Sequence, residues 1–418
     1  MKALQKHSQL LSKEKDPSRL IRETWKHFVN VLPMLIESDI APIDAATLIF
    51  VPGMSELEEL WSVLLAKEPR KEKCSIVGMH SLFDQAALDE VFEPIEPGSK
   101  RIILATNIAE SSVTLPEVAC VIDLGLEKRM LYDYRRDATV LSLCFASRDA
   151  KMQRAGRTGR TRAGTVLRLC LKEQEDLLPL TAPPEMEHSP PSMILLEAIA
   201  HCATWGSGIE VATSLPSPLS EEVCERAMRQ LRDRHAVIAV GEKWQLSSLG
   251  EMGAHLPIPL DDAILLLVAC QLNLLWEGLI LAARMVGHDP FVQVRGMYYH
   301  ATAEGEDRFF HDTSNSLQHR THWDAGYHSQ HFQIVRLMTA YFRLDPTKAK
   351  HAQFAAKNGV NRDRLTQVSS SMRMIAQRLL ETANSRYCTL TLSEAQEEML
   401  QSLRQGYFHP SKINGNAS

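Results

Sequence analysis

The 418-residue sequence lacks an apolar run long enough to cross a membrane, and its first residues lack the features of a secretory signal. Its eight cysteines are scattered and form no Cys-x-x-Cys pair, which argues against a zinc or dithiol site and favours reduced, buried thiols. Positive charge is not in excess either, because the formal net charge is −5. These absences predict a soluble intracellular protein without a membrane partner, in a compartment that the composition does not specify.

A net negative chain binds nucleic acid only through a local basic patch. One candidate is residues 101–170, which hold 12 Lys and Arg against 7 Asp and Glu, a local charge of +5. Such an asymmetry is more often a solvated face than a binding site, so the sequence motifs have to decide between the two. The chain is long enough for two or three domains.

Residues 46–170 alternate short apolar runs with amphipathic stretches, a pattern typical of a doubly wound parallel α/β sheet. Strands are predicted at 47–51, 75–79, 101–105, 118–122 and 165–169, and helices at 56–66, 86–92 and 149–157. Two further β-rich runs, 130–134 and 139–145, flank Arg135-Arg136-Asp137. They predict a β-hairpin that projects from the sheet domain.

The proline-rich stretch 181–191 predicts a domain boundary near residue 185. Helices at 192–201 and 221–234, followed by two short strands within 236–246, predict a winged-helix domain over 185–257. An all-α bundle is predicted over 258–403, with helices at 261–275, 276–286, 330–342 and 362–383. The polar stretch 295–326 is predicted to be a long connection. Six histidines in and near it suggest a metal site, but solvated loop histidines are the simpler explanation, and no metal site is predicted: His300, His311, His319, His322, His328 and His331.

The strongest motif is the run Q-R-A-G-R-T-G-R at residues 153–160, whose arginines recur every three residues. Helical spacing brings Arg154, Arg157 and Arg160 near one another, and guanidinium groups suit the charge of a phosphoryl group in transfer. The alternative is a basic helix end without a function.

Two other motifs follow predicted strands. A-T-N-I-A-E-S-S at 105–112 places Thr106 and Asn107 directly after one strand, and L-I-F-V-P-G at 48–53 ends in Gly53 after another. The carboxyl ends of parallel strands are where such sheets bind ligands, so these residues suit phosphate contacts. Each could also be only a polar strand end.

In this order, the three motifs resemble motifs four, five and six of DEAH/RHA helicases in superfamily two. Gln153 at the start of the last motif favours DEAH over DEAD proteins. Further segments are similar to the family's accessory domains: L-S-S-L-G at 246–250, L-P-I-P at 256–259 and G-Y-F at 406–408. The resemblance covers nearly all of residues 46–408.

The resemblance implies roles for single residues. Arg157 and Arg160 would be arginine fingers on the γ-phosphate of ATP, and Gln153 would position water or phosphate. Phe92 in V-F-E-P would stack on adenine, although a core phenylalanine is an equal alternative from the sequence. RNA would be contacted by Thr106, Asn107, Gly53 and, in the hairpin, Arg135.

The resemblance also fails at defined points. The sequence contains no G-x-x-x-x-G-K-[ST] phosphate cradle and no D-E-x-H element. The first RecA-like lobe, with the ligands for Mg²⁺, would therefore be missing, and the chain alone is not expected to hydrolyse ATP. We interpret residues 1–45 as an inter-lobe connection with an N-terminal helix, 46–184 as the second RecA-like lobe and 404–418 as the truncated start of an OB domain.

Two functions remain open from the sequence. The first is the C-terminal half of an ATP-dependent RNA helicase that moves 3′ to 5′; its partners would be RNA, the first lobe and, by resemblance, a glycine-rich activator protein. The second is a noncatalytic RNA-binding or scaffold protein derived from a helicase. A DNA helicase is a more distant alternative.

Overall fold

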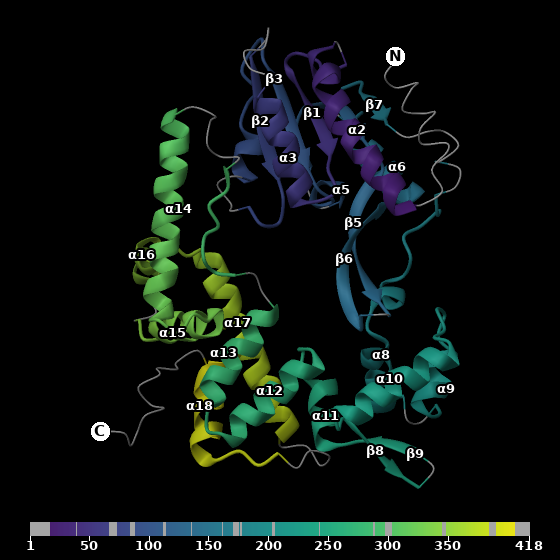
Figure 1. Cartoon of the computed structure of the whole chain (residues 1–418), viewed down its shortest axis with the longest axis vertical. Coiled ribbons are helices and arrows are strands. Elements are labelled where there is room, and N and C mark those ends of the chain that lie inside the picture. The colour runs from purple at the N-terminus through teal and green to yellow at the C-terminus, as the bar shows by residue number, and fades with distance from the viewer. Residues whose placement is uncertain are drawn as a thin grey trace. The chain divides into compact units, whose positions relative to one another are not determined.

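The computed structural model describes residues 17–38, 40–66, 73–83, 88–111, 114–134, 136–160, 162–169, 175, 178–202, 205–241, 243–286, 289–296, 303–344, 348–383 and 390–405. The chain divides into two compact units. The first comprises Met1–His188 and Gly296–Glu306, and the second comprises Ser189–Arg295 and Asp307–Ser418. Figure 1 labels their elements.

The first unit is built on a five-stranded parallel sheet in the order β2-β3-β1-β4-β7. Every residue of β1, β3 and β4 is buried, which explains why these strands are almost continuously apolar in sequence. The predicted α/β sheet is therefore confirmed, with strand bounds within two residues of those expected: β1 Ala45–Phe50, β2 Cys74–Met79, β3 Lys100–Ala105, β4 Val118–Asp123 and β7 Thr165–Arg168.

Helices cover both faces of this sheet. Helices α2 (Pro17–Glu37) and α3 (Met54–Leu65) pack on the face of the sheet that carries Ile49, Ile102 and Ile122. The 3₁₀ turn η1 (Glu90–Phe92) and helix α5 (Ile108–Ser111) contribute to the core on the opposite face. Helix α6 (Arg148–Ala155) lies on that second face too, because its Arg154 guanidinium is 5.2 Å from the ring centre of Phe50.

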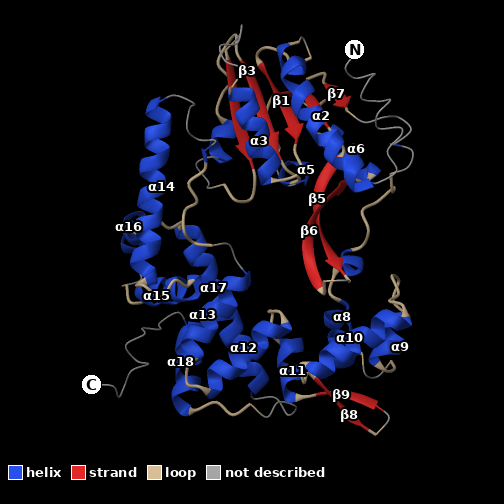
Figure 2. Cartoon of the chain, viewed as in Figure 1, coloured by secondary structure: helices blue, strands red, loops and turns tan. Residues whose placement is uncertain are grey.

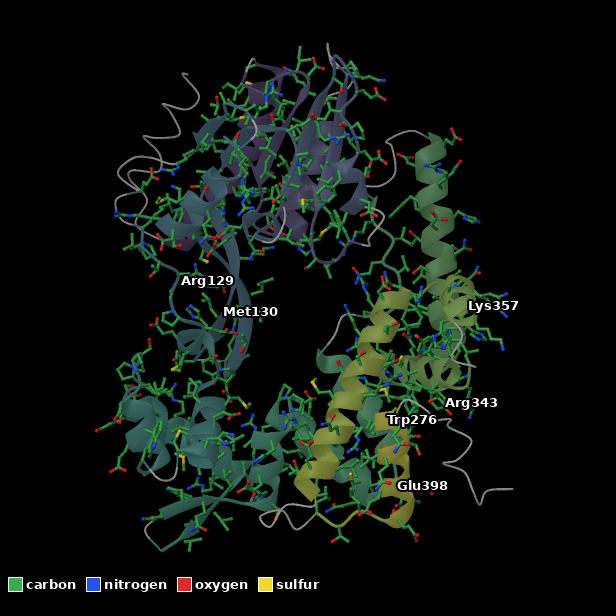
Figure 3. All side chains as sticks on the ribbon, turned by 180° about the vertical axis from the view of Figure 1, so that it is seen from behind. Arg129, Met130, Trp276, Arg343, Lys357 and Glu398 are labelled. Atoms are coloured by element: carbon green, nitrogen blue, oxygen red, sulfur yellow. The ribbon has the colours of Figure 1, made fainter. Side chains whose placement is uncertain are left out.

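A two-stranded antiparallel hairpin, β5 (Leu126–Asp133) and β6 (Ala138–Phe145), extends from the sheet, as the sequence predicted (Figure 2). Figure 3 labels Arg129 and Met130 on it. Met130 lies opposite Leu141 in the register, and these side chains are 50% and 59% exposed. Arg135, a predicted RNA contact, lies outside the described residues.

The second unit is almost wholly helical (Figure 2). Its only strands among the described residues are β8 (Val237–Val240) and β9 (Lys243–Leu246), which form a hairpin with Gly241 at φ +63°. The predicted helices are present, with α15 and α17 at the predicted bounds, and helix α9 was not predicted. The winged-helix and ratchet assignments stay predictions. The helices are α8 Pro191–His201, α9 Gly208–Thr213, α10 Glu221–Asp233, α11 Ser248–His255, α12 Leu260–Gln271, α13 Leu275–Val286, α14 Ala303–Asp324, α15 Gln330–Phe342, α16 Lys348–Lys357, α17 Arg362–Ala383 and α18 Glu394–Gln405.

The prediction of a long connection over 295–326 was wrong, because helix α14 occupies residues 303–324. A helix satisfies its backbone hydrogen bonds within itself, so a polar sequence without proline can form one with few apolar anchors. Near its end, Arg320 pairs with Asp289 at 2.9 Å and lies 4.6 Å from the ring centre of Phe291, while Trp323 is buried.

Among the described helices, none is by itself long and apolar enough to span a membrane; α11 and α12, which meet at a bend of 119°, pass this test only as a pair. The described residues contain no group of three His, Cys, Asp or Glu side chains that could hold a metal ion. The G-Y-F motif at 406–408 lies outside the described residues.

Candidate functional site

Arg154, the first arginine of the Q-R-A-G-R-T-G-R motif, is buried, with only 1% of its surface exposed. Its guanidinium donates hydrogen bonds to the carboxylates of three acidic residues, each at 3.1 Å: Glu110, Asp123 and Glu127. A fourth bond of 3.1 Å goes to the backbone oxygen of Leu126. One side chain therefore connects the end of β4, the start of the hairpin and helix α5.

Charge explains why this burial is stable. Burial alone would lower the pKa of Arg154, but the carboxylates of Asp123, Glu110 and Glu127 outweigh it and raise that pKa. For Glu110 the balance is opposite, because desolvation raises the pKa of its carboxyl despite the nearby guanidinium. The group is a mutually dependent network, in which each member compensates the buried charge of another.

The other two arginines of the motif are more exposed than Arg154. Arg157 is half-buried, and burial together with the neighbouring Arg160 guanidinium lowers the pKa of Arg157. Arg160 is exposed, and its guanidinium donates to the Gly156 backbone oxygen at 3.1 Å and to the Thr114 hydroxyl at 3.4 Å. Gln153 is also exposed, on helix α6 itself.

The loop that carries these arginines is fixed by Thr158. Its hydroxyl donates to the Val118 backbone oxygen at 2.8 Å, at the amino end of β4. A Cβ atom on Gly164 would lie 1.9 Å from that hydroxyl oxygen, so glycine is required for the close approach. Gly159 adopts φ +76°, which L side chains rarely adopt. The loop is therefore held at the amino edge of the sheet.

Phe92 lies on the same face of the sheet as this loop, since its neighbour Val91 shares a core cluster with Leu115, which precedes β4. The Phe92 ring is 45% exposed, which excludes the alternative of a core phenylalanine. The buried side chain of Arg101 holds the backbone next to Phe92 in place. Its guanidinium donates to the backbone oxygens of Glu93 and, at 3.2 Å, Pro94.

The remaining predicted residues lie at the opposite edge of the sheet, where β1 and β3 end side by side. The backbone N–H of Val51 donates to the Ala105 oxygen at 2.8 Å, so the segments of Gly53 and Thr106 are neighbours. Asn107 is exposed, whereas Thr106 is only 5% exposed. Gly53 is buried, and a Cβ atom there would lie 2.7 Å from the side chain of Lys128.

The structure therefore separates the predicted residues into two groups. Arg160 and Phe92 belong to the amino edge, and Thr106, Asn107 and Gly53 to the carboxyl edge. Arg154 and Arg157 lie between them, since the charges of both interact with the carboxylate of Glu110, on the short helix α5 that begins directly after Asn107. At the carboxyl edge the hairpin is tied to α3 by an ion pair of 2.7 Å between Lys128 and Glu56.

Sequence reasoning missed Arg101, Glu110, Asp123 and Glu127 as parts of the site. Glu110 lies within a motif that the sequence analysis named, so its position was a usable signal. The other three carry no local signal, because their partners come from segments 8 to 31 residues away in sequence.

Comparison with known proteins fits this arrangement. The family described as helicase conserved C-terminal domain matches residues 31–162. The probable ATP-dependent RNA helicase spindle-E of Drosophila persimilis is 31% identical over 278 residues, which cover 64% of this chain and 19% of that protein. ATP-dependent RNA helicase dhx29 of Xenopus laevis is 30% identical over 268 residues, covering 63% and 19%. A putative DEAH-box ATP-dependent helicase of Mycosarcoma maydis is 30% identical over 255 residues, covering 60% and 16%.

The match at residues 31–162 and the parallel sheet show that the first unit contains a helicase conserved C-terminal domain. These relatives, like the motifs, support a resemblance of the chain to the DEAH-type helicases of superfamily two. The matched part of the chain spans less than a fifth of the length of these relatives.

Proposed function

We propose that the chain supplies the second motor lobe and the nucleic-acid clamp of an ATP-driven RNA helicase. The observation that carries this proposal is the difference in burial among the three arginines of one motif. Arg154 is buried and fixes the helix, whereas Arg157 is half-buried and Arg160 is exposed. A basic helix end without a function would not need three buried or half-buried carboxylates to hold one arginine. The motif is therefore built to present guanidinium groups at a fixed position.

In this proposal, Arg157 and Arg160 reach the γ-phosphate of ATP held by a separate first lobe. Guanidinium groups stabilise the charge that develops during phosphoryl transfer, and Gln153 orients water or phosphate beside them. The exposed ring of Phe92 stacks on the adenine, on the same face of the sheet. The described residues present no cluster of carboxylates suited to Mg²⁺, and we assign the metal ligands to the first lobe.

RNA would run along the carboxyl edge, where exposed Asn107 is the most accessible of the predicted contacts. Thr106 and Gly53 are covered, so RNA contact at these positions requires the side chain of Lys128 to move away from Gly53. The second unit, as a winged-helix domain over 185–257 and a ratchet bundle over 258–403, would close over the RNA backbone during 3′-to-5′ translocation. A glycine-rich activator protein is a further partner in this proposal.

The test is RNA-stimulated ATP hydrolysis by the chain, alone and with a separately produced first lobe of a DEAH-type helicase. We expect no hydrolysis by the chain alone and hydrolysis in the mixture. Loss of an arginine finger costs about 10³-fold or more in kcat, so Arg157→Ala and Arg160→Ala should each abolish most of the rate.

Arg168→Ala is the matched control, because Arg168 lies in the same unit, at the end of strand β7. Among the described residues, its only ion pair is with Glu175, at 2.7 Å. Association of the two lobes is checked by sedimentation before rates are compared. An associated mixture that binds RNA but stays silent would favour the noncatalytic scaffold. Hydrolysis by the chain alone, or full activity of Arg157→Ala, would contradict the proposal.

A further inference from the structure

The second unit exposes a pair of stacked aromatic rings that none of the motifs includes. Tyr327 and Phe332 lie with ring centres 4.5 Å apart and planes 20° from parallel. Their side chains are 61% and 49% exposed. Two large rings that stack on each other and still face water leave an apolar surface uncovered, which is the kind of feature that marks a binding site.

The pair is held in place before any ligand arrives. Tyr327 lies in a tight turn between α14 and α15, where Ala325, Gly326 and His328 all have positive φ. The Asp324 carboxylate accepts hydrogen bonds of 2.8 Å from the backbone N–H groups of Ser329 and His328. These bonds lower the pKa of Asp324, so its charge holds the turn at neutral pH. A preorganised aromatic pair loses little conformational entropy on binding.

Arginines continue the same face of helix α15. Phe332, Arg336 and Arg343 are spaced four and seven residues apart, which places them in one line along a helix of 3.6 residues per turn. All three are exposed, whereas the opposite face is buried through Ile334, Leu337, Met338 and Tyr341. The line is about 16 Å long at 1.5 Å per residue, which is the length of a few nucleotides.

The surroundings of this face are strongly basic. Residues 327–364 contain 7 Lys and Arg against 2 Asp and Glu, a local charge of +5 in a chain of −5. Lys350 and Lys357 are exposed on helix α16, whose His351 packs against Tyr341 at a ring distance of 4.5 Å. Figure 3 shows Arg343 and Lys357 at the outer side of these helices. The segment that contains the aromatic pair is thus a basic part of the chain.

We propose that Tyr327, Phe332, Arg336 and Arg343 form a binding surface for single-stranded RNA. Bases would stack on the open ring surfaces, and the arginines would contact the phosphates that follow. Single strands fit better than duplex, because paired bases offer no open face for stacking. The inference deepens the proposed function, since it takes RNA as the polymer, but it does not depend on ATP hydrolysis.

The first test measures binding of a fluorescein-labelled twelve-nucleotide oligouridylate to the full chain by fluorescence anisotropy. Stacking on an aromatic side chain contributes roughly 1–3 kcal/mol per base, so Phe332→Ala should raise Kd about 5- to 150-fold. Phe310→Ala is the matched control. Phe310 is 68% exposed on helix α14, away from this basic segment in sequence, and its removal should leave Kd unchanged.

A second polymer separates base stacking from charge. The same oligomer made of abasic ribose phosphates keeps the phosphates and lacks the bases. Wild type should prefer the oligouridylate, and Phe332→Ala should lose that preference. Arg336→Gln should instead weaken both polymers and reduce the slope of log affinity against log salt by about 0.7, the value for one phosphate contact on a single strand. Arg229→Gln, on α10, is the control for loss of an exposed arginine.

The outcomes divide clearly between the two proposals. If wild type binds the oligouridylate and the Phe332 and Arg336 variants bind it equally well, this surface is not the RNA site. If a duplex competes better than a single strand, the stacking argument is wrong. A Phe332 effect on RNA binding in an associated but catalytically silent mixture would uphold this surface and overturn the motor function. Active hydrolysis stimulated by RNA in a Phe332→Ala chain with wild-type affinity would do the reverse.

Discussion

Helices α6 and α15 both have basic side chains at helical spacing, but these side chains are buried in α6 and exposed along α15. In α6, in the first unit, Lys151 and Arg154 are each 1% exposed, and carboxylates surround Arg154. In α15, in the second unit, Arg336 and Arg343 face water, and the buried side is purely hydrophobic except for Tyr341. The comparison shows that the spacing of basic residues predicts a shared face but not whether that face is a core or a surface.

The difference has a physical cause. A guanidinium enters the interior only where acidic groups from other segments compensate its charge. Three such groups converge on Arg154 from α5, β4 and β5, and they hold the displayed arginines of the motif in position. On helix α15, Arg336 and, at its C-cap, Arg343 are exposed to water instead, and in the proposed RNA surface they contact phosphates.

The largest expected loss of stability comes from removing the charge of Arg154 in α6, and the matching change in α15 is the substitution of Arg336. Arg154→Met leaves Glu110, Asp123 and Glu127 without their common partner, and loss of one member of a buried ionic group costs about 3–5 kcal/mol. Arg336→Met removes an exposed side chain and should stay within about 0.5 kcal/mol. Hydrogen exchange followed by mass spectrometry measures the opening free energy of each unit separately.

Protection should fall in β4 and the hairpin of the Arg154→Met chain while helices of the second unit keep theirs. Glu127→Gln, which removes one of three carboxylate charges, should cost less than Arg154→Met. Equal protection in the Arg154→Met and Arg336→Met chains would remove the contrast between the two helices.

A smaller effect is expected at Gly164, which lies against Thr158. Gly164→Ala places a methyl group 1.9 Å from the Thr158 hydroxyl oxygen, so the loop has to shift and its bond to Val118 weakens. Overpacking of this kind costs about 1–3 kcal/mol. In the same loop, a Cβ atom on Gly156 would come no closer than 3.4 Å to its neighbours.

Gly156→Ala is therefore the matched control and should be neutral or slightly stabilising. The midpoint of urea unfolding, followed in the first unit by hydrogen exchange, compares the two variants. Should Gly164→Ala prove as stable as Gly156→Ala, the close contact with Thr158 would not be what holds the arginine loop.

The smallest effect on stability concerns one buried cysteine in the core of each unit, a feature that the two units share. Burial raises the pKa of Cys120 in the first unit and of Cys270 in the second to about 11 each. Both thiols are neutral in the folded and unfolded chain below about pH 8.5, so their contribution to stability is complete there and is lost as pH rises towards 11.

Both thiols should therefore react slowly with Ellman's reagent at pH 8 until denaturant is added, whereas half-buried Cys74 and Cys202 should react faster. Peptide mapping after alkylation identifies the order. Fast labelling of Cys270 in the native chain would show that the core of the second unit opens more readily than that of the first.

Much of the fold was predictable from sequence. The five parallel strands and the hairpin were expected within a few residues of their observed bounds, because continuous apolar runs and β-rich pairs are local signals. Helix α14 was not predicted, since its polar sequence shows little of the apolar periodicity that marks a buried helix face. Helix α9 is short, and its capping box of Ser207 and Glu210 was the signal that could have revealed it.

Less of the candidate site than of the fold was predictable from the sequence. The motifs pointed to Arg157, Arg160, Thr106 and Asn107, whose roles stay predictions; the structure places Thr106 and Asn107 at the carboxyl edge of the sheet and Arg160 at its amino edge. The sequence did not reveal which arginine of the motif is buried. That depends on Asp123 and Glu127, which approach Arg154 only when β4 and β5 are packed against α6.

By itself, then, the sequence determined the class of fold, the order of most elements and the resemblance to DEAH-type helicases, because these depend on residue types and spacings along the chain. Only the tertiary structure decided which charges are buried, which arginines are displayed and that Tyr327 and Phe332 stack in the open. The physical reason is that burial of a charge or a ring depends on partners brought from distant segments, and local spacing carries no record of them.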